Sequence, residues 1–116
     1  MKIKIQKKKE SLLKYIQNIK NSKIILSVMT LGVHLSMVFD KELIALIGPN
    51  NYDDLHLYKK ATVILPENKC QFRPCNLPTG VNNCGCMPQI NSNKITRTIS
   101  KIYEKISWII LRIKII

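Results

Sequence analysis

Cysteine is absent from this sequence outside one short stretch, and the spacing that redox enzymes use is missing altogether. The four cysteines lie between residues 70 and 86, and none of them forms a Cys-x-x-C pair. A thioredoxin-like redox function is therefore unsupported. Aromatic residues are also scarce, at 6% of the chain, and no recognisable nucleic-acid-binding motif is present. Without a cluster of base-stacking aromatics, we expect no specific nucleic-acid partner.

Acidic residues are few as well, and the basic excess is confined to the two ends of the chain. Nineteen Lys and Arg stand against seven Asp and Glu, which gives a net charge of +12. Residues 1–23 and 94–116 carry this whole excess, because residues 24–93 contain five basic and five acidic side chains. Basic flanks attract any polyanion. We expect them to add affinity for an anionic membrane or glycan surface, with residues 1–23 as a basic lead.

No stretch that is both uncharged and predominantly apolar reaches the roughly 20 residues that a full membrane span requires. The longest one, Ile24 to Phe39, follows the Lys-rich lead as the hydrophobic region of a secretory signal does. Three interpretations stay open for residues 24–48: a cleaved signal, an uncleaved signal-anchor and a buried core helix. The cleavage pattern is poor, because Leu stands at the −3 position for both Ala45 and Gly48. We favour targeting to the secretory route, with membrane anchoring as the alternative.

Residues 49–93 combine a short strand with the cysteine segment. The β-branched run from Ala61 to Leu65 is closed by Pro66 and predicts a strand. The segment that follows is rich in Pro, Gly and Asn, so it cannot bury an apolar core of its own. It therefore requires disulfides or a metal to hold a shape. His56 near Asp53 and Asp54 resembles a catalytic cluster, but a solvated loop explains it and we predict no catalytic residue.

The cysteine spacing favours disulfides over a metal. Structural zinc sites use pairs two to four residues apart, whereas the spacing here is C-x4-C-x8-C-x-C. We therefore predict two disulfides among Cys70, Cys75, Cys84 and Cys86, an oxidising compartment, and no metal or other cofactor. A bridge between Cys84 and Cys86 would be strained. Two pairings remain open: Cys70–Cys84 with Cys75–Cys86, and Cys70–Cys86 with Cys75–Cys84.

The run ATVILPENKCQFRPCNLPTGVNNCGCMP, residues 61–88, resembles the cysteine-rich secreted salivary proteins of ticks. The chain differs from them in having fewer cysteines and no N-x-[ST] site. The resemblance implies a secreted protein that binds a host protein of haemostasis or immunity and modulates or inhibits it. It rests on a strand that ends in Leu-Pro, a Pro/Gly-rich interval and a closing Cys-x-Cys: Val63, Leu65, Pro66, Cys70, Pro74, Cys75, Cys84, Cys86 and Pro88.

The C-terminal flank has a different pattern, in which isoleucines repeat at alternating intervals of four and three residues from Ile95 to Ile116. This period, with no Gly or Pro from Lys94 onward, predicts one amphipathic helix over residues 94–116. Its basic residues lie off the apolar seam. We expect the helix to pack on residues 24–48 or on a partner, with a membrane-interface helix and a strand as alternatives.

These patterns predict a small disulfide-rich loop and β segment flanked by α-helices, with little regular core. We divide the chain into residues 1–23, 24–48, 49–93 and 94–116. The function expected is binding or inhibition, not catalysis. Arg73, with Phe72 and Pro74 beside it, would enter the specificity pocket of a trypsin-like enzyme through its charge, although a solvated loop residue is the simpler explanation. Two alternatives are a membrane-anchored protein with a four-cysteine zinc knuckle and a basic amphipathic membrane-active peptide precursor.

Overall fold

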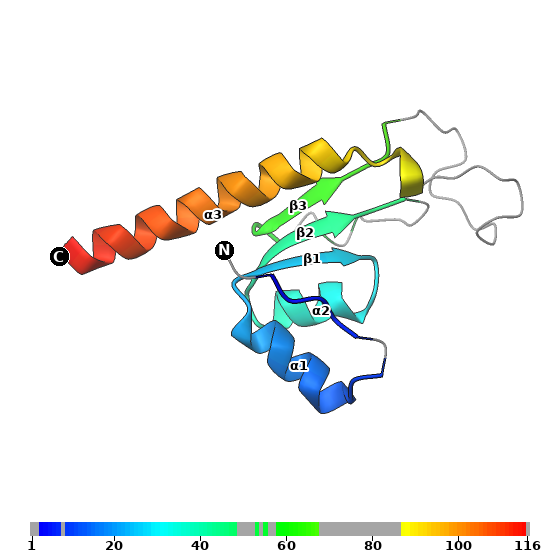
Figure 1. Ribbon diagram of the computed structural model, residues 1–116, viewed down its shortest axis with the longest axis horizontal. Coiled ribbons are helices and arrows are strands. Elements are labelled where there is room, and N and C mark those ends of the chain that lie inside the picture. The colour runs from blue at the N-terminus through cyan, green and yellow to red at the C-terminus, as the bar shows by residue number, and fades with distance from the viewer. Residues whose placement is uncertain are drawn as a thin grey trace, which may run out of the picture.

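The structure is a three-stranded parallel sheet between helices (Figure 1). This computed structural model describes residues 3–7, 9–48, 53, 55, 58–67 and 87–115, with side chains described up to Ser107. The strands lie in the order β1-β2-β3. The elements are α1 (Leu12–Asn21), β1 (Ile24–Val28), α2 (Leu31–Val38), β2 (Glu42–Leu46), β3 (Ala61–Ile64), η2 (Met87–Gln89) and α3 (Ser92–Ile115).

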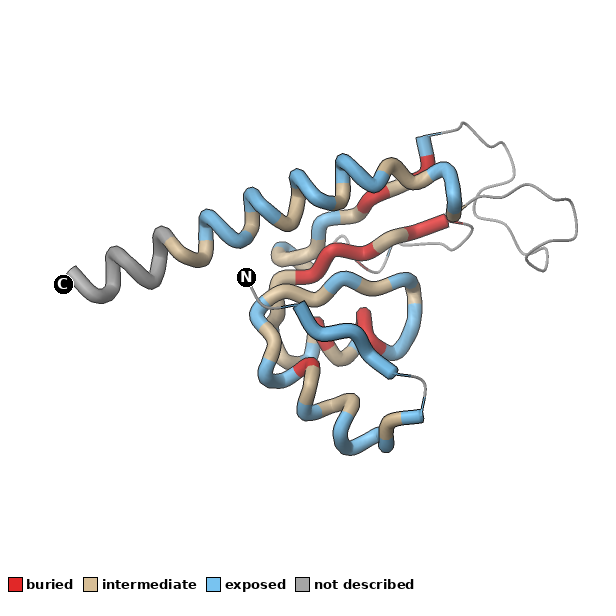
Figure 2. The backbone as a smooth tube through the Cα atoms, in the orientation of Figure 1, coloured by how far each residue is buried: buried red, intermediate tan, exposed pale blue. Residues whose placement is uncertain are grey.

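Among the described elements, the central strand β2 supplies the largest share of the core (Figure 2). Leu43 and Ala45 face α2 and pack with Val33 of that helix, and all three are fully buried. Because side chains alternate across a strand, Ile44 points to the opposite face, where it is also fully buried. On that face α3 contacts β1 and β2. A parallel sheet needs cover on both faces, and α2 and α3 provide it.

The expectation of a disulfide-rich segment with little regular core is wrong, because the chain folds as α/β around this sheet. The apolar run from Ile24 to Phe39 is not one element. It is divided at Met29 and Thr30, where Thr30 caps α2 by accepting a hydrogen bond from the backbone N–H of Gly32. Its apolar residues therefore supply a strand and a crossover helix, and residues 24–48 as a whole form β1, α2 and β2.

A tight stop after α2 returns the chain to the sheet. Asp40 adopts a left-handed conformation, with φ of 56°, directly after the last residues of the helix. Its N–H donates to the carbonyl of Met37, and the N–H of Lys41 donates to the carbonyl of Ser36. This is the Schellman pattern, with aspartate in the position that glycine usually occupies. It allows β2 to begin soon afterwards, at Glu42.

Two predicted elements are confirmed. The run expected as a strand contains β3, and the isoleucine repeat forms α3. The expected docking of that helix on residues 24–48 is also confirmed, because α3 contacts β1 and β2. Up to Ser107 its basic side chains are exposed, and half-buried positions mark the apolar seam: Ile95, Ile99, Ile102 and Ile106.

The first helix is joined to the residues that precede it through one side chain, that of Asn18. Asn18 of α1 donates to Gln6 and Glu10 and accepts a hydrogen bond of 2.8 Å from the Lys4 ammonium. The helix itself begins at the Ser11 cap, whose hydroxyl accepts from the N–H of Lys14. Its apolar face is only partly used: Ile19 is buried, whereas Leu12 and Leu13 are exposed.

Replacement of Leu43 by alanine tests whether β2 holds the fold. Leu43 is 0% exposed, so Leu43→Ala is expected to lower the free energy of unfolding by about 2–5 kcal/mol. Leu13, which is 68% exposed on α1, provides the matched control Leu13→Ala, expected to change stability by less than about 0.5 kcal/mol. Urea denaturation measures both, and equal losses would contradict the placement of the core.

A second prediction concerns alkaline pH. The Tyr58 hydroxyl donates to the carbonyl oxygen of Lys41 and lies 3.3 Å from that of Ser36. Burial, and next the charge of Asp40, raise the pKa of Tyr58. Its stabilising effect is therefore complete below the unfolded pKa of about 10 and is lost as pH rises through the folded value. The pKa of Lys60 is also raised, through its hydrogen bond to Asp40, so Lys60 adds to the same alkaline loss.

We expect Tyr58→Phe to lose about 1 kcal/mol at neutral pH, because a hydrogen bond disappears. The variant should also show a shallower fall in stability above pH ~10. Thermal unfolding between neutral and alkaline pH measures both effects. The exposed Tyr103 of α3 supplies the control Tyr103→Phe, which should follow the unaltered protein. If the stability of Tyr58→Phe falls with rising pH as steeply as that of the unaltered protein, Tyr58 does not contribute to the alkaline loss of stability.

Candidate functional site

The two ends of the cysteine segment are joined by hydrogen bonds at the carboxyl edge of the sheet. The backbone N–H of Glu67, three residues after β3, donates to the carbonyl oxygen of Gln89 at 3.1 Å. The side-chain amide of Asn91 donates to the Glu67 carboxylate at 2.8 Å. Residues 68–86 therefore leave and rejoin the structure at one place, which we call the hydrogen-bonded base (Glu67, Gln89 and Asn91).

Asn91 connects this base to the start of α3. Its side-chain oxygen accepts a 2.9 Å hydrogen bond from the N–H of Asn93, which is the interaction of a helix cap. Its carbonyl also accepts hydrogen bonds from the N–H groups of Lys94 and Ile95. One residue thus begins the long helix and holds Glu67 through its amide. Beside it, Pro66 is buried, so the base is attached to the packed part of the fold.

The residues predicted as the binding and disulfide site lie outside the described part of the chain. This applies to Cys70, Phe72, Arg73, Pro74, Cys75, Cys84 and Cys86, and also to Asp54 and His56. Asp53 is exposed, and so is His34 on the outer side of α2. Across residues 3–67 and 87–107, as far as they are described, no three His, Cys, Asp or Glu side chains come together as a metal site.

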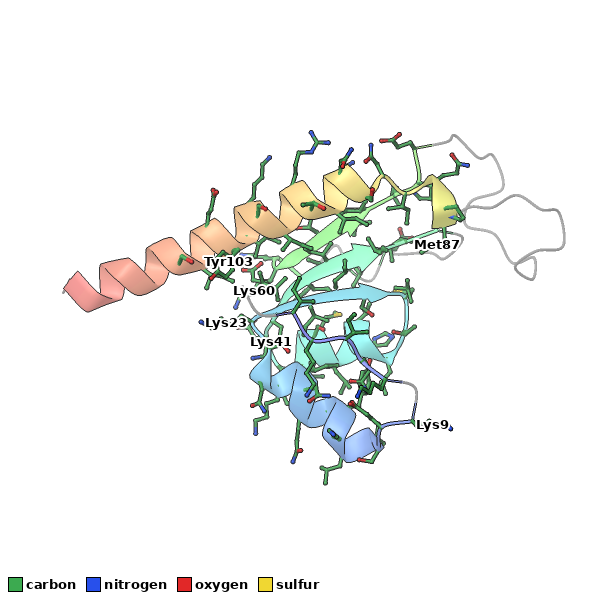
Figure 3. All side chains as sticks on the ribbon, viewed as in Figure 1. Lys9, Lys23, Lys41, Lys60, Met87 and Tyr103 are labelled. Carbon is green, nitrogen blue, oxygen red and sulfur yellow. The ribbon has the colours of Figure 1, made fainter. Side chains whose placement is uncertain are left out.

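At the opposite edge of the sheet, lysines precede all three strands (Figure 3). Strand pairing aligns Ile24 with Glu42 and Leu43 with Ala61. Continued outward, the same register aligns Lys23 with Lys41 and Lys41 with Lys59. We call these three residues the lysine row. Adjacent strands lie about 4.8 Å apart, so three ammonium groups can face one surface at this edge.

Sequence reasoning missed the lysine row because it averaged charge over residues 24–93. The available signal was positional, since a lysine stands one or two residues before each of three β-rich runs. Parallel strands bring their amino ends to a common edge, but the sequence did not identify the strands of residues 24–46. Lys23 and Lys59 are exposed and Lys41 is half-buried.

The neighbouring Lys60 has a carboxylate partner. Its ammonium lies 2.8 Å from the Asp40 carboxylate and 3.1 Å from the Asp40 carbonyl oxygen. The side chains are 42% and 73% exposed, so this ion pair contributes little to stability. It does hold the turn after α2 against the start of β3. The charges of Lys60 and Asp40 offset each other. The electrostatic potential at this edge is therefore set by the lysine row together with the half-buried Glu42.

Comparisons with protein-family models, curated proteins and solved structures found no match to this chain. Among the helices that the structure describes, none combines the length and the apolar content needed to span a bilayer.

The hydrogen-bonded base can be tested by reversing its donor and acceptor. Asn91→Asp keeps the helix cap but places a carboxylate against Glu67, so it should destabilise the protein by about 1 kcal/mol. Adding Glu67→Gln places an amide at position 67, which can donate a hydrogen bond to the new carboxylate at position 91. We expect the double variant to regain most of the loss in urea denaturation, with a coupling energy of about 0.5 kcal/mol or more. Additive effects would mean that the two side chains do not interact.

Proposed function

We propose that the protein is a non-catalytic binding protein whose α/β support presents residues 68–86 to a partner protein. The observation that carries this proposal is the hydrogen-bonded base. It joins both ends of a nineteen-residue segment to the carboxyl edge of a packed sheet. Recognition segments on rigid supports are a common arrangement, because the support limits the freedom of the segment's ends.

The partner class follows from the sequence of the segment and from its resemblance to tick salivary proteins. Arg73 stands beside Phe72 and Pro74 between two cysteines, and a cationic side chain suits the pocket of a trypsin-like protease. We propose that this segment inhibits a host protease of that class, with Arg73 as the principal contact. Two disulfides among the four cysteines would reduce the conformational freedom that binding otherwise removes.

We also propose that the protein is secreted, because disulfides persist in oxidising compartments. The fold adds a condition to this proposal. Residues 24–48 form β1, α2 and β2, so the secreted form with this fold retains them. Cleavage after Ala45 or Gly48 would remove the central strand and its fully buried residues.

Binding to a catalytically inactivated trypsin tests the proposal without digestion of this lysine-rich chain. We expect Arg73→Ala to weaken the affinity by about thirtyfold or more, since it removes a central charged anchor. Lys69→Ala, which removes a nearby charge from the same segment, is the matched control and should have little effect. Surface plasmon resonance measures both dissociation constants.

Equal weakening by the two variants, or no binding by the unaltered protein, would reject the protease-binding role. Intact mass measured before and after reduction provides a second, independent check. Two disulfides predict a gain of four hydrogen masses on reduction, because four cysteines are present. Free thiols in the native protein would reject the disulfide-stabilised segment and with it the secreted location.

A further inference from the structure

A second surface lies at the amino edge of the sheet, where α3 passes beyond the strands. The helix begins near Glu67 at the carboxyl edge and runs back along the sheet (Figure 1). With 24 residues it is about 36 Å long, whereas five-residue strands span about 17 Å. The C-terminal half of α3 therefore projects past the amino edge.

The projecting half continues the pattern of the docked half. In the docked half, Ile95, Ile99, Ile102 and Ile106 are half-buried and mark the side of the helix that faces the sheet. The intervals of three and four residues continue at positions 109 and 113, which places these isoleucines on the same helical face. That face has the sheet beneath it only as far as the strands extend.

The lysine row lies at the same edge of the sheet past which α3 projects. Figure 3 shows Lys23, Lys41 and Lys60 at this edge, whereas Lys9 is at the far end of α1. Four lysines (23, 41, 59 and 60) stand at the edge against two carboxylates, Asp40 and Glu42. Asp40 is engaged by Lys60, so a positive excess faces outward from the start of the strands.

We propose that the lysine row and the projecting half of α3 together bind the surface of an anionic phospholipid bilayer. The lysines supply attraction to phosphate and carboxylate headgroups, and each ammonium group near the surface adds to it. The isoleucine repeat continues through the projecting half, as the apolar side of an interfacial helix requires, and Arg112 and Lys114 stand off this repeat. Charge alone would also suit a soluble polyanion. The apolar positions beside the charge favour the bilayer, because a glycan or nucleic acid gives them nothing to enter.

This surface is separate from the hydrogen-bonded base that flanks the proposed recognition segment, because the base lies at the opposite edge of the sheet. A protein that uses both would be held on a membrane by its amino edge, with the hydrogen-bonded base at the edge farther from the lipid. A variant that loses protease binding should still bind vesicles, and the reverse also holds. Trypsin binding and vesicle binding therefore test the two proposals separately.

The experiment is sedimentation of the full chain with vesicles of phosphatidylcholine, with and without phosphatidylserine. We expect binding only when phosphatidylserine is present. The triple variant Lys23→Gln, Lys41→Gln, Lys59→Gln should weaken it by at least about tenfold. The matched control removes the same charge from the lead and α1: Lys7→Gln, Lys9→Gln, Lys14→Gln. It should change binding by less than about threefold. Circular dichroism and thermal unfolding confirm that both variants fold.

A second pair of variants separates a bilayer from a soluble polyanion. Ile109→Ser with Ile113→Ser should reduce vesicle binding by about tenfold or more but leave heparin and duplex DNA binding unchanged. Leu12→Ser with Leu13→Ser, at exposed positions of α1, is the control and should alter neither. Three results would overturn the proposal: equal loss from the two lysine triples, vesicle binding that is insensitive to the isoleucine variants, or tighter binding to DNA or heparin than to the vesicles.

Discussion

The pairing of β2 with a strand on each side is the interaction on which the rest of the structure depends. Parallel strands cannot be joined by a tight turn, so each pairing requires a crossover, and both sheet faces then require cover. The short α2 is the crossover between β1 and β2 and covers one face, while α3 covers the other. Leu43, Ile44 and Ala45 are fully buried because both layers meet on this strand.

This arrangement gives the two edges of the sheet different chemistry. At the carboxyl edge, the chain leaves β3, forms the hydrogen-bonded base and begins α3. At the amino edge, each strand is entered from a polar turn, and the fold collects one lysine from each approach. The same parallel topology therefore produces both proposed surfaces. It also keeps them apart, since a strand's two ends lie on opposite sides of the sheet.

The sequence predicted those elements whose pattern is local and uninterrupted. The strand before Pro66 and the isoleucine repeat of α3 each fit one period from end to end, so both were predictable. Residues 24–39 were not, because a strand and a helix follow each other there without a charged residue between them. A continuous apolar run of this kind has the same composition in a signal sequence and in a βα unit. Thr30 and Gly32 contained the only cue, a cap and a small residue at the new helix start.

The candidate sites also differ in whether their residues lie close together along the chain. Arg73 and the cysteines could be singled out from sequence because they lie close together along the chain. The lysine row could not, because its members are separated by about eighteen residues and meet only through strand register. The hydrogen-bonded base joins Glu67 to residues more than twenty positions later, which no local pattern reveals. Such sites become visible only once the topology is known.

The division between the sheet and the cysteine segment changes what disulfides would contribute. In a fold with little core, the bridges would have to supply most of the stability. Here the buried residues of β2, α2 and β3 already form a core, and the base closes the segment without any covalent bond. Bridges confined to residues 70–86 would therefore restrict that segment alone, and their effect would be on the entropy of recognition rather than on the folding of the sheet.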